Sequence, residues 1–247
     1  MALIYEKKGR IAYITLNRPE AQNAFDPETV VEIIDAWKNY RDDDHLRCAI
    51  ITGAGDDVFS SGADLKRLIP LITGVRQPET EADKIIQKDP YLPQKAFLRT
   101  MKIDKPIIAA INGHAFGNGA ILSCACDFRF MKSGRGYFCF PEVDLGIPFL
   151  PGMIAFVRKA VPEYKFNEMK LTGKRVGADE LAAHHIIEKA CPDADAVFAE
   201  SLAFARTFHK KRGIFGEHKK RMHRHIIEVI DTEDPNYIEP LNLMVAD

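Results

Sequence analysis

Residues 105–127 read KPIIAAINGHAFGNGAILSCACD, and the pattern of this stretch sets the fold class. Pro106–Asn112 is an apolar run that ends in Asn112, which is typical of a buried strand. Gly113–Gly119 is a glycine-rich turn, and the apolar residues from there to Ser123 favour a helix. Because a buried strand leads through a turn into a helix, the stretch predicts an α/β protein.

Further strand and helix signals lie on both sides of this stretch. Ile4–Lys8 and Ile11–Leu16 are short β-prone runs joined through a glycine, which predicts an N-terminal hairpin. Asp26 can cap a helix that runs to about Tyr40, and Cys48–Thr52 predicts another buried strand. We also expect strands at Arg129–Lys132 and Tyr137–Phe140, and helices at Pro151–Lys159, Asp179–His184, Ala194–His209 and Glu217–Ile230.

The length of the chain bounds its domain organisation. At 247 residues and 27.8 kDa it is near the upper size of a single hydrophobic core. From Gly177 onward the pattern is almost wholly helical, so we expect a core domain over 1–190 and a C-terminal helical region over 191–247. Residues 72–93 contain three prolines and no clean period, which predicts a partly helical, mobile excursion.

Charge and composition exclude several classes of protein. Lys and Arg number 34 against 35 Asp and Glu, so no global field attracts nucleic acid or an acidic membrane, and we expect neither as a partner. No apolar stretch is free of polar breaks over the length of a membrane span, and the opening MALIYEKKGR has no apolar signal core. The five cysteines lack metal-ligand spacing. We therefore expect reduced, mostly buried thiols, no bound metal and a cytoplasmic location.

Two loops can present backbone amides at the carboxyl ends of strands. In the first, Gly62 lets the backbone approach a ligand closely, and Ala63 offers an N–H that no large side chain obstructs. The second is the turn Gly113–Gly119, which enters a helix whose amino terminus carries free N–H groups. Taken alone, each loop is also typical of a plain chain reversal. Together they could stabilise an oxygen that becomes negative during a reaction.

Four ordered segments resemble the blocks of the crotonase superfamily. They are ITLNRPEAQNAF (14–25), ITGAGDDVFSSGADL (51–65), the stretch 105–127 and FCFPEVDLGIP (138–148), and the likeness spans about 5–189. The resemblance implies an α/β core of repeated β-β-α units wound in a superhelix, with a C-terminal helical trimerisation region. It also implies a coenzyme A thioester as substrate and no separate cofactor. The thioester oxygen would lie between the N–H groups of Ala63 and Asn118, the second standing where many members have glycine.

The acidic residues distinguish the reactions within this superfamily. Members that resemble enoyl-CoA hydratase carry two glutamates, but here the first position is Ile121 and only the second is kept, as Glu142. Loss of one carboxylate removes an acceptor that positions water. The single-glutamate pattern resembles the Δ3,Δ2-enoyl-CoA isomerases, in which one carboxylate moves a proton from C2 to C4. Leu150 stands where dienoyl-CoA isomerases and aromatic-CoA dehalogenases would have aspartate, so we expect neither of those reactions.

The resemblance also indicates residues that contact the substrate. Lys66 could meet a phosphate or the adenine edge of coenzyme A, although it is also typical of a surface lysine. Arg18 could replace the basic residues that members often carry at the positions of Ala21 and Gln22. His114 could touch the thioester or pantetheine, or be satisfied within its loop. The expected substrate-contacting set is Gly62, Asp64, Lys66, Gly117, His114 and Arg18.

Two other functions stay open at this stage. One is an enoyl-CoA hydratase or another acyl-CoA enzyme of the same fold that recruits a different second catalytic group, such as a residue of the segment 72–93. The other is an inactive relative that binds RNA or protein through the basic tail at residues 209–221. Neither the acyl chain length nor the pathway can be read from the sequence.

The C-terminal helices predict an assembly of several copies. Their apolar residues exceed what one core needs, and the resemblance implies a homotrimer or a dimer of trimers. The residues on which this expectation rests are Phe198, Leu202, Ala205, Phe208, Ile226, Ile227 and Ile230.

Overall fold

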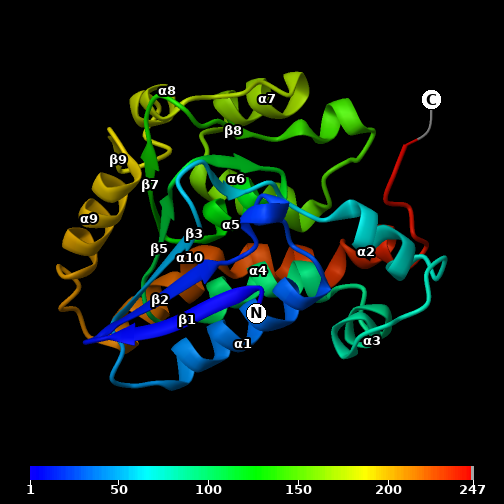
Figure 1. Ribbon diagram of the computed structural model, residues 1–247, viewed down its shortest axis with the longest axis horizontal. Coiled ribbons are helices and arrows are strands. Elements are labelled where there is room, and N and C mark those ends of the chain that lie inside the picture. The colour runs from blue at the N-terminus through cyan, green and yellow to red at the C-terminus, as the bar shows by residue number, and fades with distance from the viewer. Residues whose placement is uncertain (246–247) are drawn as a thin grey trace.

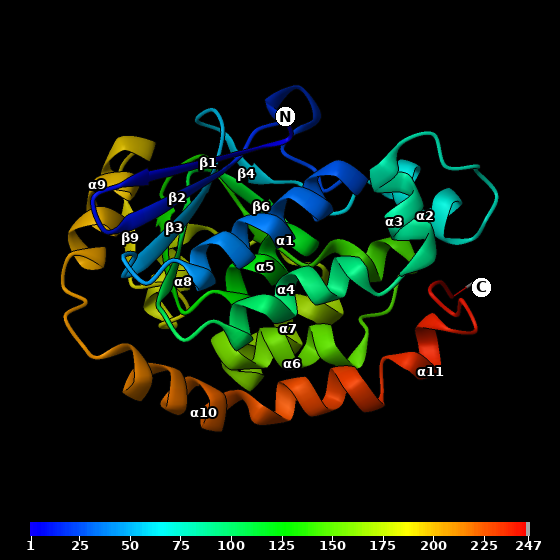
Figure 2. The ribbon, with the colours of Figure 1, turned by 90° about the horizontal axis from the view of Figure 1, so that it is seen from below.

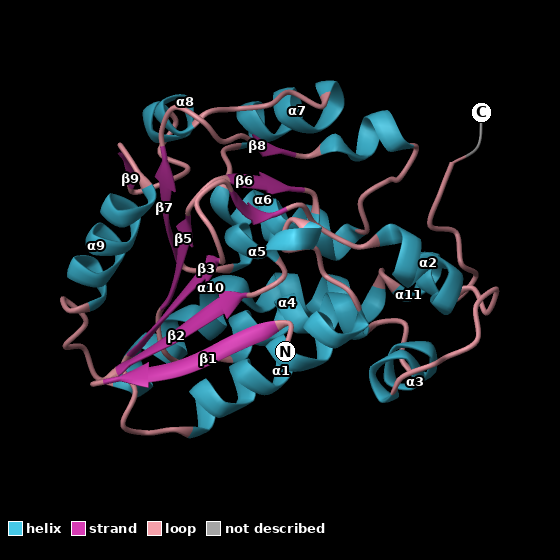
Figure 3. Cartoon of the chain, viewed as in Figure 1, coloured by secondary structure: helices cyan, strands magenta, loops and turns pink. Residues whose placement is uncertain are grey.

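The computed structural model describes residues 1–245. It contains two β-sheets (Figure 3). The larger sheet contains, in spatial order, β1 (Leu3–Lys8), β2 (Ile11–Leu16), β3 (Cys48–Gly53), β5 (Ile107–Ile111), β7 (Phe128–Lys132) and β9 (Lys189–Cys191). The smaller sheet contains β4 (Val58–Ser60), β6 (His114–Phe116) and β8 (Phe138–Cys139). Only β1 and β2 pair antiparallel among these strands, which confirms the N-terminal hairpin, and all other neighbours are parallel.

From β3 onward, consecutive strands alternate between the two sheets. In the pairs β3 and β4, β5 and β6, and β7 and β8, the first strand joins the larger sheet and the second joins the smaller one. Each pair leads into a helix or helical turn: α2 (Leu65–Ile72), α5 (Asn118–Ala125) and the 3-10 turn η2 (Pro141–Leu145). This repeated β-β-α unit confirms the α/β superhelix that the resemblance implies, and it can be followed in Figure 1.

The remaining helices cover the sheets. They are η1 (Pro19–Ala21), α1 (Pro27–Asp42), α3 (Glu81–Lys88), α4 (Leu92–Lys102), α6 (Pro151–Ala160), α7 (Glu163–Thr172), α8 (Ala178–Ala183), α9 (Ala194–Ala205), α10 (Arg212–Thr232) and α11 (Pro235–Ile238). The helix α10 runs along α6 and α4, as Figure 2 shows. Within residues 1–245 no helix is both long and apolar enough to cross a membrane.

The central strands are buried on both faces because alternate side chains enter different cores. In β3, Ala49 and Ile51 belong to the main core, whereas Cys48 and Ile50 pack in a second core beneath α9. The same alternation continues in β5. A strand with apolar partners on both sides needs no polar positions, which explains the unbroken apolar run in the sequence.

Three strands differ from the sequence-based expectation. The chain is not almost wholly helical after Gly177, because Lys189–Cys191 forms β9 and pairs with β7 across the expected boundary at residue 190. The strands β4 and β6 are not predicted either. Each of these three strands has three residues, which is too short for a periodic pattern to form.

The excursion over residues 72–93 is anchored by a buried ion pair. It contains α3, as the partly helical pattern predicts. Asp83 of this helix is fully buried and accepts hydrogen bonds from Arg76 at 2.9 and 3.0 Å. The pairing offsets the cost of burying the carboxylate and ties α3 to the residues that precede it.

All five cysteines are buried and free of disulfide bonds. Burial raises the pKa of Cys124 to about 11 and that of Cys126 to about 12, so both thiols are protonated at neutral pH.

Ile121 of α5 is fully buried in the main core. We therefore expect Ile121→Glu to lower the free energy of unfolding by roughly 3 kcal/mol or more, because no partner is available to a carboxylate there. Ile121→Val is the matched control, with an expected loss of about 1 kcal/mol. Urea denaturation measures both. Equal losses in the two variants would contradict the core position.

Candidate active site

A cavity of about 190 Å³ lies where the glycine-rich loops, η2 and the C-terminal end of the described chain meet. Its walls are mostly apolar, and they include Leu68, Ile69, Ile72, Phe149, Leu150 and Met153. Ile238 and Leu243 add a wall from the same chain's C-terminal segment. Among the described residues that line it, Glu142 is the one with an ionisable side chain.

Two backbone amides face this cavity from loops that touch each other. Ala63 and Asn118 both line it, and a Cβ added to Gly62 would lie 3.1 Å from the Asn118 nitrogen and 2.7 Å from the Phe116 oxygen. Gly62 also has φ of +92°, so only glycine fits this crossing point. Neither amide has an acceptor within residues 1–245, and that of Asn118 opens α5. The fold of the described residues therefore uses neither N–H group.

Glu142 is held against the start of α5 by its own short turn. It lies in η2, which begins at Pro141 and ends at Leu145, and the following residue, Gly146, has a left-handed φ of 64°. The Glu142 residue is 9% exposed. A Cβ added to Gly117 would lie 3.1 Å from Glu142 Oε1, so this oxygen faces the loop that carries the Asn118 amide. Residues far apart in sequence thus meet in one cavity.

Burial and a neighbouring cation act on Glu142 in opposite directions. Burial raises the pKa of Glu142, and the positive charge of Lys170 in α7 lowers it. The Lys170 ammonium donates a hydrogen bond to Glu142 Oε2 at 3.3 Å and lies 3.6 Å from the centre of the Phe149 ring. The net pKa of Glu142 stays above its ordinary value because burial is the larger effect. Lys170 was missed by the sequence analysis, since no motif marks a lysine near the end of a helix.

The six expected substrate contacts divide into two groups. Gly117 lines the cavity and Gly62 lies buried beside it. Arg18 and Asp64 instead face each other at 3.7 Å, and Arg18 also contacts Asp26 at 3.2 Å. These internal partners favour a structural role for the Arg18 side chain.

Lys66 and His114 do not line the cavity either. Lys66 is exposed on α2, where it remains free to meet a phosphate from outside. His114 lies in β6, where its Nδ1 accepts a hydrogen bond from the Tyr137 amide at 3.2 Å. Burial lowers the pKa of His114 and so favours the neutral ring. Its hydrogen bond with Tyr137 fits a histidine whose partner lies within the protein.

Residues 72–93 contribute only apolar contacts to the cavity. Ile72, Pro90 and Pro93 line it, and no ionisable side chain of this segment does so. The alternative in which the excursion supplies a second catalytic group is therefore not supported by the geometry. Ile121 is fully buried and does not line the cavity. Among the described residues, no carboxylate other than that of Glu142 lines it.

A buried carboxylate joins the helices behind the cavity. Asp234, which precedes α11, accepts hydrogen bonds from the Gly152 amide at 2.8 Å and from Gln94 Nε2 at 3.1 Å. Gln94 lies in α4 and Gly152 in α6. This junction holds the C-terminal segment in place as a wall of the cavity.

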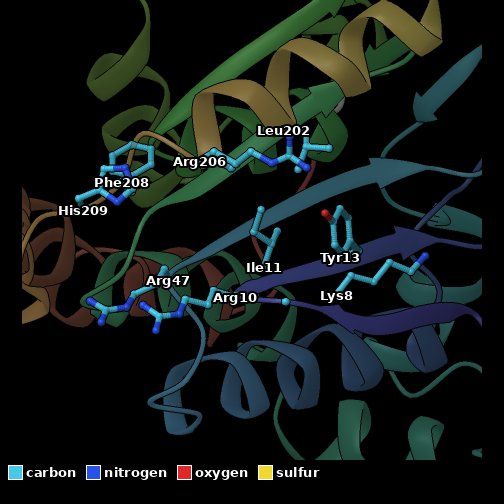
Figure 4. A pocket seen from close by; sticks show the side chains of 11 residues that line it. Lys8, Arg10, Ile11, Tyr13, Arg47, Leu202, Arg206, Phe208 and His209 are labelled. Atoms are coloured by element: carbon cyan, nitrogen blue, oxygen red, sulfur yellow. The ribbon is translucent and has the colours of Figure 1, made fainter.

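A larger hollow of about 560 Å³ lies elsewhere, at the beginnings of β2 and β3 (Figure 4). Five basic side chains line it: Lys8, Arg10, Arg47, Arg206 and His209. Arg10 and Arg47 lie side by side, since the Arg47 amide donates to the Arg10 carbonyl at 2.7 Å. This basic hollow shares no lining residue with the cavity at Glu142. Of the predicted basic tail only His209 reaches it, and the absence of a nucleic-acid partner stays a prediction.

Comparison with known proteins places these features in one family. The profile of the enoyl-CoA hydratase/isomerase family matches residues 6–233. An (E)-benzylidenesuccinyl-CoA hydratase from Thauera aromatica is 35% identical over 214 residues, which cover 83% of this chain and 77% of that protein. A carnitinyl-CoA dehydratase from Escherichia coli K12 is 37% identical over 191 residues, which cover 76% of this chain and 67% of that protein.

Solved structures agree with this assignment. The enoyl-CoA hydratase/carnithine racemase from Magnetospirillum magneticum superposes with a TM-score of 0.78 at 27% identity, over 91% of this chain and 81% of the other. The enoyl-CoA hydratase from Bacillus halodurans has a TM-score of 0.81 at 20% identity, over 97% of this chain and 94% of the other, and supports the fold.

Gly117→Ala tests the contact between the α5 loop and Glu142. Gly117 has φ of 50°, so alanine there should cost about 1–2 kcal/mol of strain, and the clash with Oε1 should cost roughly 1 kcal/mol more. Gly134→Ala is the matched control, because Gly134 has φ of 74° and no atom near its added Cβ. We expect urea denaturation to show the larger loss of stability in Gly117→Ala. A loss no greater than that of the control would contradict the contact.

Proposed function

The chain belongs to the enoyl-CoA hydratase/isomerase family, and from this we propose that it shifts the double bond of a 3-enoyl-CoA thioester to the 2-position. One observation carries the proposal: a single ionisable side chain, Glu142, lines an apolar cavity into which two unpaired amides open. One base and an oxyanion site suffice for isomerisation. The substrate contains coenzyme A, and the reaction requires no other cofactor.

The proposed mechanism transfers one proton within the substrate. The thioester oxygen accepts hydrogen bonds from the Ala63 and Asn118 amides. Glu142 removes a proton from C2, and the C–H electron pair moves into a dienolate whose negative oxygen the two amides stabilise. A donor of this kind contributes roughly 10²- to 10³-fold to the rate. Glu142 then returns the proton to C4, and the electrons form the conjugated C2–C3 double bond. The apolar walls exclude the water that would compete for the dienolate.

Hydration of a 2-enoyl-CoA is the second candidate function. It is favoured by the relatives named as a hydratase and a dehydratase. Hydration requires a group that positions water as well as one that moves the α-proton, and the described cavity offers one carboxylate. Isomerisation therefore fits the residues better. The third possibility is an inactive relative that binds RNA or protein. An absence of turnover with both 3-enoyl-CoA and 2-enoyl-CoA would favour it.

Glu142→Gln should abolish the isomerase activity with little change in fold or substrate binding. An amide of nearly the same shape cannot accept the C2 proton, so we expect kcat to fall roughly 10³-fold or more. Asp144→Asn is the matched control, since Asp144 is an exposed acid of the same turn that does not line the cavity.

The assay follows ultraviolet absorbance of the conjugated thioester, formed from 3-enoyl-CoA or consumed from 2-enoyl-CoA. Formation by the wild type and by Asp144→Asn, but not by Glu142→Gln, is the expected result. Turnover retained in Glu142→Gln would refute the role of Glu142 as the catalytic base. Consumption of 2-enoyl-CoA alone would replace isomerisation by hydration.

We further propose a cytoplasmic homotrimer or dimer of trimers. The apolar helix residues on which the sequence argument rests are mostly used within one chain: Ala205, Ile226 and Ile230 are buried there, and Leu202, Phe208 and Ile227 are partly buried against the two cores. Phe198 of α9 remains 41% exposed beside Tyr13. The assembly therefore rests on family likeness more than on surplus apolar surface.

Static light scattering at low concentration should give three or six times the chain mass of 27.8 kDa. Deletion from Glu217 onward should dissociate or aggregate the protein, because it removes most of α10, which packs on α4 and α6, and two wall residues of the cavity. A fully active, stable species of 27.8 kDa from the full chain would refute the assembly.

A further inference from the structure

The two carboxylate oxygens of Glu142 have different surroundings. Oε1 faces Gly117, at whose position an added Cβ would approach it to 3.1 Å. Oε2 accepts a hydrogen bond from Lys170 Nζ at 3.3 Å. Because Gly117 directly precedes the amide of Asn118, Oε1 is on the side of the oxyanion donors. Oε2 points toward α7.

Lys170 is held in place by its own contacts. It lies in the last turn of α7, which packs against η2, and its side chain is 14% exposed. Its ammonium sits 3.6 Å from the centre of the Phe149 ring, and Phe149 lines the cavity. In the described chain Glu142 is the one carboxylate within 4.0 Å of this ammonium. A lysine side chain that is mostly buried and has one carboxylate partner has little freedom to move elsewhere.

We propose that Lys170 is the positioning residue of this site: it keeps Glu142 ionised and holds Oε2, so that Oε1 is the oxygen presented to the substrate. The proposal rests on the proposed function, in which Glu142 is the base. While Lys170 holds Oε2, the proton taken from C2 stays on Oε1. The acid is then already turned toward the dienolate when the proton returns at C4.

The other groups around Glu142 cannot replace this cation. From β8, the Cys139 thiol is neutral because burial raises its pKa to about 11. From η2 itself, Asp144 is exposed and carries a negative charge that cannot favour a second carboxylate. From α5, the backbone amides serve the substrate oxygen. Among the described residues, Lys170 is thus the one cation that acts on the buried carboxylate.

The test compares three lysine variants of the full-length chain. Lys170→Met removes the charge, and Lys170→Arg keeps it. Lys174→Met is the matched control, because Lys174 pairs with Glu168 at 2.7 Å and Glu180 at 2.9 Å, away from Glu142. Protein labelled with ¹³C at the glutamate carboxyl carbon is titrated by NMR, and the Glu142 signal is assigned by its loss in Glu142→Gln.

We expect Lys170→Met to raise the pKa of Glu142, and Lys170→Arg and Lys174→Met to leave it near the wild-type value. Glu142 must be ionised to accept a proton, so activity falls as the pH falls through its pKa. A raised pKa moves that fall to higher pH. At pH values below the raised pKa of Glu142, we expect the kcat/KM of Lys170→Met to be lower than that of the wild type by roughly tenfold or more, with kcat affected more than KM. A purely structural role would give a loss independent of pH and no rescue by arginine.

The titration separates this proposal from the proposed function. An unchanged Glu142 titration in Lys170→Met overturns the positioning role, whatever the activity. Retained turnover in Glu142→Gln overturns the base, and with it the role of Lys170 in presenting that base. If Lys170→Met fails to fold, the double variant Lys170→Met/Glu142→Gln, which buries no unpaired charge there, should recover the fold. A double variant that also fails to fold overturns the proposal.

Discussion

The site depends on one constraint: an ionised carboxylate must stand in an apolar cavity beside amides that have no acceptor of their own. Burial alone favours the neutral acid, and the raised pKa of Glu142 records this cost. Lys170 offsets part of the cost from outside the cavity, because its ammonium donates a hydrogen bond to the carboxylate. The same apolar environment strengthens the hydrogen bonds that the amides of Ala63 and Asn118 can donate to a developing negative charge.

The β-β-α repeat brings these groups together. Each repeat sends one strand to the larger sheet and one to the smaller sheet, and the loops that carry Ala63, Asn118 and Glu142 follow the short strands of the smaller sheet. Ala63 follows β4, Asn118 follows β6 and Glu142 follows β8. Because these three strands are parallel neighbours, their carboxyl ends lie at one edge, and the three loops meet there. The cavity is thus a consequence of topology, with Gly62 and Gly117 allowing the loops to touch.

Burial of Ile121 in α5 bears on the choice between reactions. Its side chain packs in the main core, so a hydrophobic contact that stabilises the fold occupies a position where hydratase-like members carry an acid. Among the described residues that line the cavity, Glu142 is the one with an ionisable side chain, and Ser61, Gln94 and Asn118 are its uncharged polar lining. Chemistry that transfers one proton within the substrate suits a single acid–base group, whereas hydration needs acid–base chemistry at both the water and the α-carbon.

The sequence alone determined the α/β class, the N-terminal hairpin, the buried strands and the two loops with available amides, because these depend on local periodicity and glycine placement. It also singled out Glu142, through a resemblance in ordered motifs. It could not reveal β4, β6 and β9, whose three residues carry no period and form strands only because neighbours supply hydrogen bonds. Nor could it show that Arg18 is turned inward onto Asp26 and Asp64, or that Lys170 meets Glu142. Those ion pairs join segments that are distant along the chain, and only tertiary packing decides which charged side chains are buried in contact with one another.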